Sequence, residues 1–310
     1  MTNGIDRPDE PTGSTESELH YHVNGDLVPA SEATVSIDDR GFRYGDGAFE
    51  TLRAYGGTLF GWNRHMRRLA ETCEALSLDH GLSPDDLHQR IDETLAANDI
   101  EDAYVRLSIT RGVQPGKLTP QPVDDPTVVV YVKPLPRGGF QGKTVWDRPA
   151  VLQSVETRRI PDEALPAGAK THNYLNGILA RTELDQAADE ALMCDTDGLV
   201  AEGTTSNLFF VRDETLYTPA ADGSLLPGIT RELVLELAAE TDVPVQEGSY
   251  ELEFVAGADE AFLTNRTWEL RPVASLDGTP IGGGPITAQL SGLYDELVER
   301  TCYSRTGDWL

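Results

Sequence analysis

The chain has 310 residues, of which 39% are hydrophobic, and its 52 acidic and 25 basic residues give a formal net charge of −27. A chain of this composition is globular and long enough for one large domain or two of ordinary size. The negative charge argues against nucleic-acid binding through a basic surface. No apolar run approaches the ~20 residues of a membrane helix, and no basic-then-apolar leader opens the sequence. We therefore expect a cytoplasmic protein without nucleic-acid or membrane partners.

The first part of the chain is predicted to be rich in strands. Residues 1–18 carry almost no apolar side chains and are expected to form a mobile, acidic arm. The pair at 24–25, Asn-Gly, is a hairpin turn signal. Strands are expected over 48–55, 103–110 and 127–132.

Two helices are predicted between these strands. Asn63 is the expected cap of the first helix, and Ser83 followed by Pro84 predicts the start of the second. Each helix has an apolar stripe at helical spacing: Met66, Leu69, Cys73 and Leu76 in the first, and Leu87, Ile91 and Leu95 in the second.

Residues 134–139, Pro-Leu-Pro-Arg-Gly-Gly, form the best linker in the sequence. Beyond it the patterns predict a strand at 150–156, a helix at 171–188, several short strands between 190 and 217, a helix at 230–240, a strand at 260–264 and a last helix at 286–300. We therefore expect two α/β lobes: an arm at 1–18, a small domain at 19–134, a linker at 135–142 and a large domain at 143–310.

The cysteines and the acidic residues are interpreted as features without a catalytic role. The three cysteines are far apart and odd in number, so neither a disulfide framework nor a metal site is expected. Only four of the 25 basic residues are lysines, and the acids are spread along the whole chain. This pattern indicates a solvated, halophilic surface and does not identify a substrate.

Two titratable residues are candidates for chemistry. Lys170 lies in the segment 169–176 at the predicted start of a helix, and a desolvated lysine can bond covalently to an aldehyde cofactor. The alternative is a surface lysine beside capping residues. Glu202 lies among small residues before an apolar strand. If buried it needs a cationic partner, which a protonated pyridine nitrogen could supply, whereas the alternative is an exposed acid in a turn.

A third segment, 226–231 with the sequence Leu-Pro-Gly-Ile-Thr-Arg, stands directly before a predicted helix. The free backbone N–H groups at a helix start can bind a phosphate, and an ordinary capped helix is the alternative. These three segments, in this order, strongly resemble the class IV aminotransferase family, the fold-type IV pyridoxal-phosphate enzymes. The resemblance runs from about residue 20 to 300 and includes the segments 39–53, 65–69 and 262–273.

The resemblance implies an α/β (α+β) fold with a small N-terminal α/β domain, a larger C-terminal pseudo-barrel domain and pyridoxal 5'-phosphate between them, usually in a homodimer. It implies that Lys170 is the catalytic residue that bonds to the cofactor and that Glu202 faces the pyridine nitrogen. It further implies that the phosphate is bound by Arg68, by the backbones of Ile229 and Thr230, and by the turn of Thr264, Asn265 and Arg266.

The substrate side is less defined. In the strand 103–110, alternation places Tyr104 and Arg106 on one face, where an arginine could bind a substrate carboxylate. The alternative is an arginine paired with a nearby acid. Phe49 and Tyr174 are the other expected substrate contacts.

Among the members of the family, the details favour a lyase. The loop 111–118 lacks the Arg-x-His of D-amino-acid aminotransferases, because Gly116 and Leu118 occupy those positions. The spacing of Asn173 and Tyr174 after the lysine resembles the lyases and the archaeal branched-chain enzymes, while the pair at 264–265 and the run 49–53 resemble the lyases. The hypothesis is a 4-amino-4-deoxychorismate lyase of folate biosynthesis. Alternatives are a branched-chain aminotransferase, then a D-amino-acid or R-amine transaminase, and remotely a cofactor-binding protein without turnover.

Overall fold

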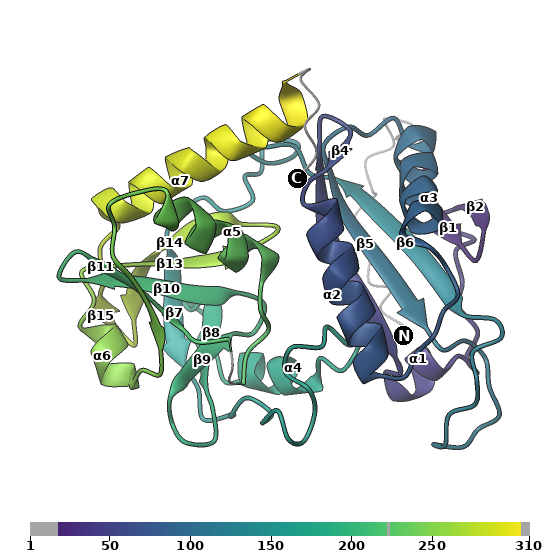
Figure 1. Cartoon of the computed structure of the whole chain (residues 1–310), viewed down its shortest axis with the longest axis horizontal. Coiled ribbons are helices and arrows are strands. Elements are labelled where there is room, and N and C mark those ends of the chain that lie inside the picture. Colours follow the sequence, from purple (N-terminus) through teal and green to yellow (C-terminus); the bar gives the residue numbers. More distant parts are fainter. Residues whose placement is uncertain (1–17, 222–223, 305–310) are drawn as a thin grey trace, which may run out of the picture.

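The computed structural model describes residues 18–221 and 224–304. Two lobes lie side by side, each built on one β-sheet, and helix α2 lies on the side of the first lobe that faces the second (Figure 1). No described helix is long and apolar enough to cross a membrane. Apart from Glu18, the predicted arm at 1–18 lies outside the described residues.

The first sheet is antiparallel and has the strand order β2-β1-β6-β5-β3-β4. The predicted turn at 24–25 joins β1 to β2, which confirms the hairpin. The strands are β1 (His20–Val23), β2 (Asp26–Pro29), β3 (Gly47–Tyr55), β4 (Thr58–Leu59), β5 (Ala103–Thr110) and β6 (Thr127–Pro134), and the helices are α1 (Arg40–Tyr44), α2 (Trp62–Ala75) and α3 (Pro84–Ala97).

Strand β5 shows why the first sheet has two different faces. Val105, Leu107 and Ile109 are fully buried in the core against α2 and α3, whereas Tyr104 and Arg106 are only partly buried. This alternation confirms the prediction for the strand, because successive side chains of a strand point to opposite faces. The polar face is therefore free to line a site.

The predicted start of α3 is confirmed, whereas the predicted cap of α2 is wrong. Ser83 caps α3 in a full capping box with Asp86, as expected. Asn63 does not cap α2, because the helix already begins at Trp62 after Gly61. Gly61 has φ 71°, a left-handed conformation that lets the chain turn directly from β4 into the helix without a side-chain cap. Leu76 follows the end of α2 and packs on the core from there.

The second sheet has the order β12-β11-β10-β13-β14-β7-β8-β9, with β15 beside β14. It is mixed, since β7 pairs in parallel with β8 and β14, and β11 with β12. The strands are β7 (Ala150–Ser154), β8 (Glu190–Cys194), β9 (Val200–Gly203), β10 (Asn207–Arg212), β11 (Thr215–Pro219), β12 (Val245–Gly248), β13 (Glu260–Asn265), β14 (Glu269–Leu276) and β15 (Thr279–Pro280). The helices are α4 (Leu175–Thr182), α5 (Ile229–Ala239), α6 (Leu252–Ala256) and α7 (Pro285–Val298), followed by a π-helical turn at Glu299–Tyr303.

The predicted helix at 171–188 is wrong in its extent, because α4 covers only Leu175–Thr182. Before the helix, the chain runs beside β3: the Phe49 N–H donates to the Lys170 carbonyl at 3.0 Å, and the His172 N–H donates to the Gly47 carbonyl at 2.9 Å. After the helix, the Glu183 carboxylate accepts from the backbone N–H of Glu156 at 2.6 Å. The backbone bonds to β3 hold residues 170–172 outside the helix, and the Glu183 side chain at the other end is bound to the loop after β7.

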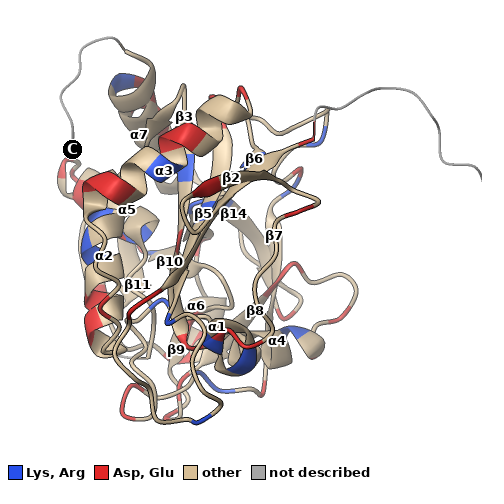
Figure 2. Ribbon diagram, turned by 90° about the vertical axis from the view of Figure 1, so that its right-hand side faces the viewer, with Lys and Arg blue, Asp and Glu red and all other residues tan. Residues whose placement is uncertain are grey.

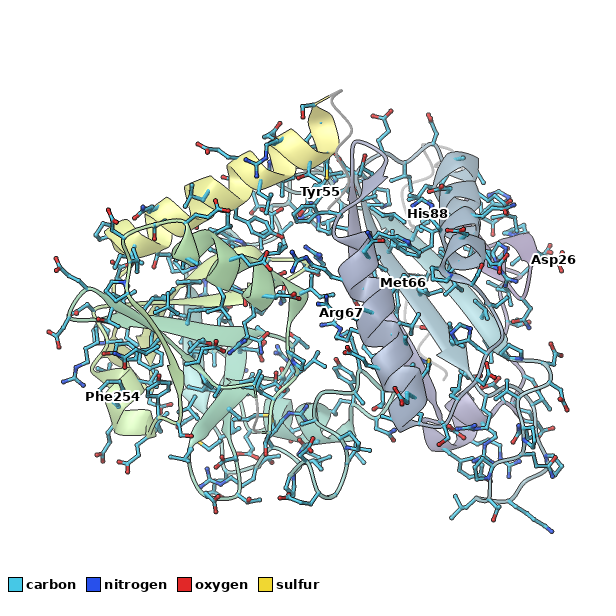
Figure 3. The ribbon with its side chains drawn as sticks, viewed as in Figure 1. Asp26, Tyr55, Met66, Arg67, His88 and Phe254 are labelled. Carbon is cyan, nitrogen blue, oxygen red and sulfur yellow. The ribbon has the colours of Figure 1, made fainter. Side chains whose placement is uncertain are left out.

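Side-chain contacts join the two lobes at α2. Arg64 and Arg67 of α2 make ion pairs with Glu232 of α5 at 2.6 and 2.9 Å, and Figure 3 shows Arg67 between α2 and the second lobe. A further contact between the lobes joins β3 to β14, where the Tyr55 hydroxyl donates to Glu269 at 2.6 Å. The strands of the first sheet lie before residue 135 in the chain, and those of the second lie after residue 149. The division into two domains at 135–142 stays a prediction.

Candidate active site

A cavity of about 360 Å³ is lined by side chains from both lobes. The first lobe contributes residues of β3, β5 and α2, and the second contributes β9, the start of α5 and the end of β13. All the residues predicted for the site line this one cavity: Phe49, Arg68, Tyr104, Arg106, Lys170, Tyr174, Glu202, Ile229, Thr230, Thr264, Asn265 and Arg266.

Lys170 is held by backbone bonds to the first lobe, so it does not stand at a helix start as the sequence suggested. Its N–H donates to the Thr72 hydroxyl of α2 at 3.0 Å, and its carbonyl accepts from Phe49. The Nζ atom lies 4.6 Å from the Phe49 ring centroid and donates to the Tyr174 hydroxyl at 3.3 Å. The amine is thus half-buried between two aromatic rings with one hydrogen-bond partner.

Glu202 is a buried acid, which excludes the alternative of an exposed acid in a turn. Its carboxylate accepts from Arg159 Nε at 2.7 Å and from the Leu226 N–H at 3.2 Å. Burial raises the pKa of Glu202, while the Arg159 guanidinium opposes this shift. A protonated pyridine nitrogen in the cavity would supply a second cation and favour the ionised carboxylate.

Sequence reasoning missed Arg159 as a partner of Glu202. The two residues are 43 positions apart and share no local pattern. The pair forms because the fold brings the loop after β7 beside β9. No signal in the sequence would have selected Arg159 over the neighbouring Arg158, because both lie in the same polar stretch.

The part of the cavity at the start of α5 fits an anionic group. Helix α5 begins at Ile229 after Gly228, which provides no side-chain cap for the first-turn N–H groups. A Cβ at Gly228 would lie 2.1 Å from the Asn207 side-chain oxygen, so only glycine allows this close approach. The buried Thr264 hydroxyl has no hydrogen-bond partner among the described residues. These donors match what a phosphate requires.

Arg68 lies beside the start of α5, and its partners were also missed from the sequence. Arg68 is buried and pairs with the buried Glu50 of β3 through Nη2, 2.6 Å from Oε2. Burial alone would raise the pKa of Glu50, but Arg68 and a hydrogen bond with His65 lower it well below its usual range. His65 and Arg68 both lie in the motif segment 65–69, and Glu50 lies in the run 49–53.

The substrate side of the cavity holds Arg106. Its guanidinium carbon lies 3.6 Å from the Phe49 ring centroid, and its Nε donates to the Ser108 hydroxyl at 3.2 Å. Arg106 makes no ion pair with a residue in the described part of the chain, so the acid-paired alternative finds no support. Tyr104 lies on the same face of β5 and lines the same cavity.

Comparison with known proteins agrees with this geometry. Residues 47–276 match the model of the amino-transferase class IV family. The chain is 36% identical over 287 residues to a putative branched-chain-amino-acid aminotransferase of Methanocaldococcus jannaschii, covering 90% of this chain and 96% of that protein. It is 32% identical over 295 residues to the aminodeoxychorismate lyase of Bacillus subtilis, covering 92% and 97%.

The fold agrees as well. A branched-chain amino acid aminotransferase of T.th., solved with pyridoxamine 5'-phosphate, superimposes with a TM-score of 0.83 at 32% identity, covering 91% of this chain and 94% of that one. This confirms the expected fold-type IV architecture. With a matching family model, full-length relatives and a cavity whose donors fit the cofactor, the chain belongs to the class IV aminotransferase family and is a pyridoxal 5'-phosphate enzyme.

Proposed function

We propose that this enzyme is a 4-amino-4-deoxychorismate lyase, which converts aminodeoxychorismate into 4-aminobenzoate and pyruvate. The observation that carries the proposal is a combination in one cavity: Arg106, a guanidinium without an acidic partner in the described part of the chain, and aromatic side chains that can pack on a ring, all beside Lys170. The substrate combines a ring amine with carboxylates. Its amine can reach the Lys170 end of the cavity while a carboxylate binds Arg106 through two parallel hydrogen bonds.

The shape of the lining also suits a planar ring. Phe49 and Tyr174 lie 5.4 Å apart between ring centroids, and Trp268 also lines the cavity. Aromatic faces of this kind pack well against a flat cyclohexadiene or benzene ring. The substrate ring would therefore lie near Lys170, with its carboxylate toward Arg106.

The residues would divide the reaction as follows. When bound, the cofactor supplies an electron sink for the carbon that carries the amine. Lys170 Nζ removes the proton from that ring carbon, and the bond between the neighbouring carbon and the enolpyruvyl oxygen breaks with its electron pair. The ring becomes aromatic, and return of one proton to the departing methylene carbon gives pyruvate. Glu202 holds the pyridine nitrogen protonated, and the Tyr174 hydroxyl orients the lysine.

A branched-chain aminotransferase is the second candidate, favoured by the apolar part of the lining. Phe49, Leu165 and Trp268 could surround an aliphatic side chain, and Arg106 could bind the carboxylate of an acidic co-substrate. Both reactions begin with proton removal by Lys170, so the substrate decides between them.

The test uses the holoenzyme with each substrate in turn. With aminodeoxychorismate we expect equal amounts of pyruvate and 4-aminobenzoate. With leucine and 2-oxoglutarate we expect no glutamate above background. Rapid formation of glutamate without release of pyruvate from aminodeoxychorismate would refute the lyase and establish the transaminase.

We further propose that the enzyme is a homodimer. Phe42 of α1 is 73% exposed, and Leu175, Ile178 and Leu179 of α4 are 50–66% exposed. The two helices are neighbours, since the Asn173 side chain donates to the Gly45 carbonyl at 3.1 Å. Adjacent exposed apolar side chains of this size are typical of an interface. Light scattering should give a dimer for the native protein and a monomer for Ile178→Glu, and an unchanged mass in that variant would exclude this face.

A further inference from the structure

Arg68 belongs to a buried chain of charged side chains behind the cavity. Its Nε and Nη2 atoms donate to the two oxygens of Glu50 at 2.9 and 2.6 Å. His65, one turn earlier on α2, contacts the same carboxylate through Nδ1 at 2.7 Å. Glu50 and His65 are 0% and 1% exposed, so water does not compete for these bonds.

The other ring nitrogen of His65 faces Arg266. The Nε and Nη2 atoms of Arg266 lie 3.1 and 3.0 Å from His65 Nε2. The remaining Arg266 donors reach the Phe60 carbonyl and the Tyr294 hydroxyl of α7. Arg266 therefore stands between the histidine and the core of the second lobe.

These partners permit one arrangement of protons. A guanidinium can only donate, so His65 Nε2 must accept from Arg266. The proton of the neutral imidazole then lies on Nδ1, which donates to Glu50. Glu50 consequently accepts from His65 and twice from Arg68, and these three donors favour the ionised carboxylate.

A count of its N–H donors shows how many hydrogen bonds Arg68 can still make in the cavity. A guanidinium has five N–H groups. Glu50 takes two of them, and the Pro227 carbonyl takes a third from Nη1 at 3.1 Å. Two N–H groups remain, and Arg68 lines the cavity beside the start of α5. A long arginine side chain is flexible, so something must hold this pair of donors in place.

We infer that Glu50 is the positioning residue that orients Arg68 toward the cofactor phosphate, and that His65 fixes Glu50 by linking it to Arg266. The inference rests on the proposed role of Arg68 at the phosphate. Glu50 does not touch the reacting atoms. It acts by keeping two arginine donors aimed at the phosphate before the cofactor arrives, which lowers the entropy lost on binding.

The charged groups around His65 keep the arrangement constant near neutral pH. Glu50 of β3 favours the imidazolium, whereas Arg68 of α2 and Arg266 after β13 oppose it, and Tyr294 lies behind Arg266. Burial together with the two arginines lowers the pKa of His65 to about 3. The histidine therefore stays neutral while the enzyme works.

The main test is Glu50→Asp, which keeps the charge and withdraws the carboxylate by about 1.5 Å, one carbon–carbon bond. Glutamine is unsuitable, because its NH₂ group would face a donor of Arg68 or His65. Apoenzyme is titrated with pyridoxal 5'-phosphate and with pyridoxal, which lacks the phosphate. We expect Glu50→Asp to weaken pyridoxal 5'-phosphate binding about tenfold or more and to leave pyridoxal binding unchanged.

Glu260→Asp is the matched control. Glu260 is a buried glutamate outside the cavity, and it accepts from the backbone N–H groups of Ile286 and Thr287 at 3.2 and 2.7 Å. Shortening it should lower stability without changing the ratio of the two affinities. Equal loss of both affinities in Glu50→Asp would show a merely structural role and overturn the inference.

The variant Arg68→Lys distinguishes a failure of the positioning role of Glu50 from a failure of phosphate binding by Arg68. If Arg68→Lys leaves the ratio of the affinities unchanged, the phosphate does not bind at Arg68 and the proposed site fails. If Arg68→Lys lowers the ratio and Glu50→Asp does not, only the positioning role fails.

A measurement on the unmodified holoenzyme covers the case in which Glu50→Asp does not fold. Nitrogen-15 NMR of His65 should show a neutral ring protonated at Nδ1 from about pH 6 to about pH 8, well above its lowered pKa. A ring protonated at Nε2, or one that titrates in this range, would overturn the inference.

Discussion

Arg106→Lys tests the substrate side of the site most directly. The ammonium keeps the positive charge but cannot present two parallel N–H groups to a carboxylate. Losing a charge-assisted bond in a desolvated site costs ~1.5–3 kcal/mol, so kcat/KM for aminodeoxychorismate should fall about 10- to 150-fold. The folded protein loses little, because Arg106 is partly exposed and makes one bond to Ser108 and one contact with Phe49.

The expected stability cost is ~1 kcal/mol, which would lower the melting temperature by about 2–4 °C. Arg212→Lys is the matched control, because Arg212 also lies over a phenylalanine, with 4.7 Å to the Phe254 centroid, and Figure 3 shows Phe254 at the far edge of the second lobe. The assay measures kcat/KM and melting temperature on the same preparations. A fall in melting temperature with unchanged kcat/KM in Arg106→Lys would remove Arg106 from the site.

Four further results are expected. Borohydride reduction of the holoenzyme followed by peptide mapping should place the cofactor on Lys170, and a label on another lysine would contradict that role. Glu202→Gln should retain cofactor but slow proton abstraction ~10²-fold in single-turnover experiments, because the charge facing the pyridine nitrogen is lost; an unchanged rate would exclude the role. Because the folded-state pKa of Glu50 is lowered, the stability that Glu50 contributes is complete above its ordinary pKa of 4.5 and is lost as the pH falls through the lowered value. The melting temperature should therefore fall as the pH is lowered below 4.5, and a melting temperature that stays constant there would contradict this. Finally, acidic residues occur on several helices and loops and not in one patch (Figure 2). Raising KCl from about 0.1 to about 1 M shortens the screening length from about 10 to about 3 Å, so repulsion between these acids weakens and the melting temperature should rise. An unchanged melting temperature would argue against a halophilic surface.

Local signals were sufficient where neighbouring residues decide the structure. The turn at 24–25, the Ser83–Pro84 helix start and the alternation in β5 all depend on residues close in the chain, and the structure confirms each. The family segments likewise gave residues that line one cavity, because each segment carries its own short pattern. The lobes that contain them were predicted from the order of these elements.

Tertiary structure decided what depends on contacts between distant residues. Helix α4 begins later than its pattern predicted because backbone bonds to β3 hold residues 170–172 outside the helix. The pairs Arg159–Glu202 and Arg68–Glu50 form only after separate strands and helices have packed together. A buried charge needs a partner, but the sequence does not say which one, since any of 25 basic residues could meet a given acid until the fold has placed them.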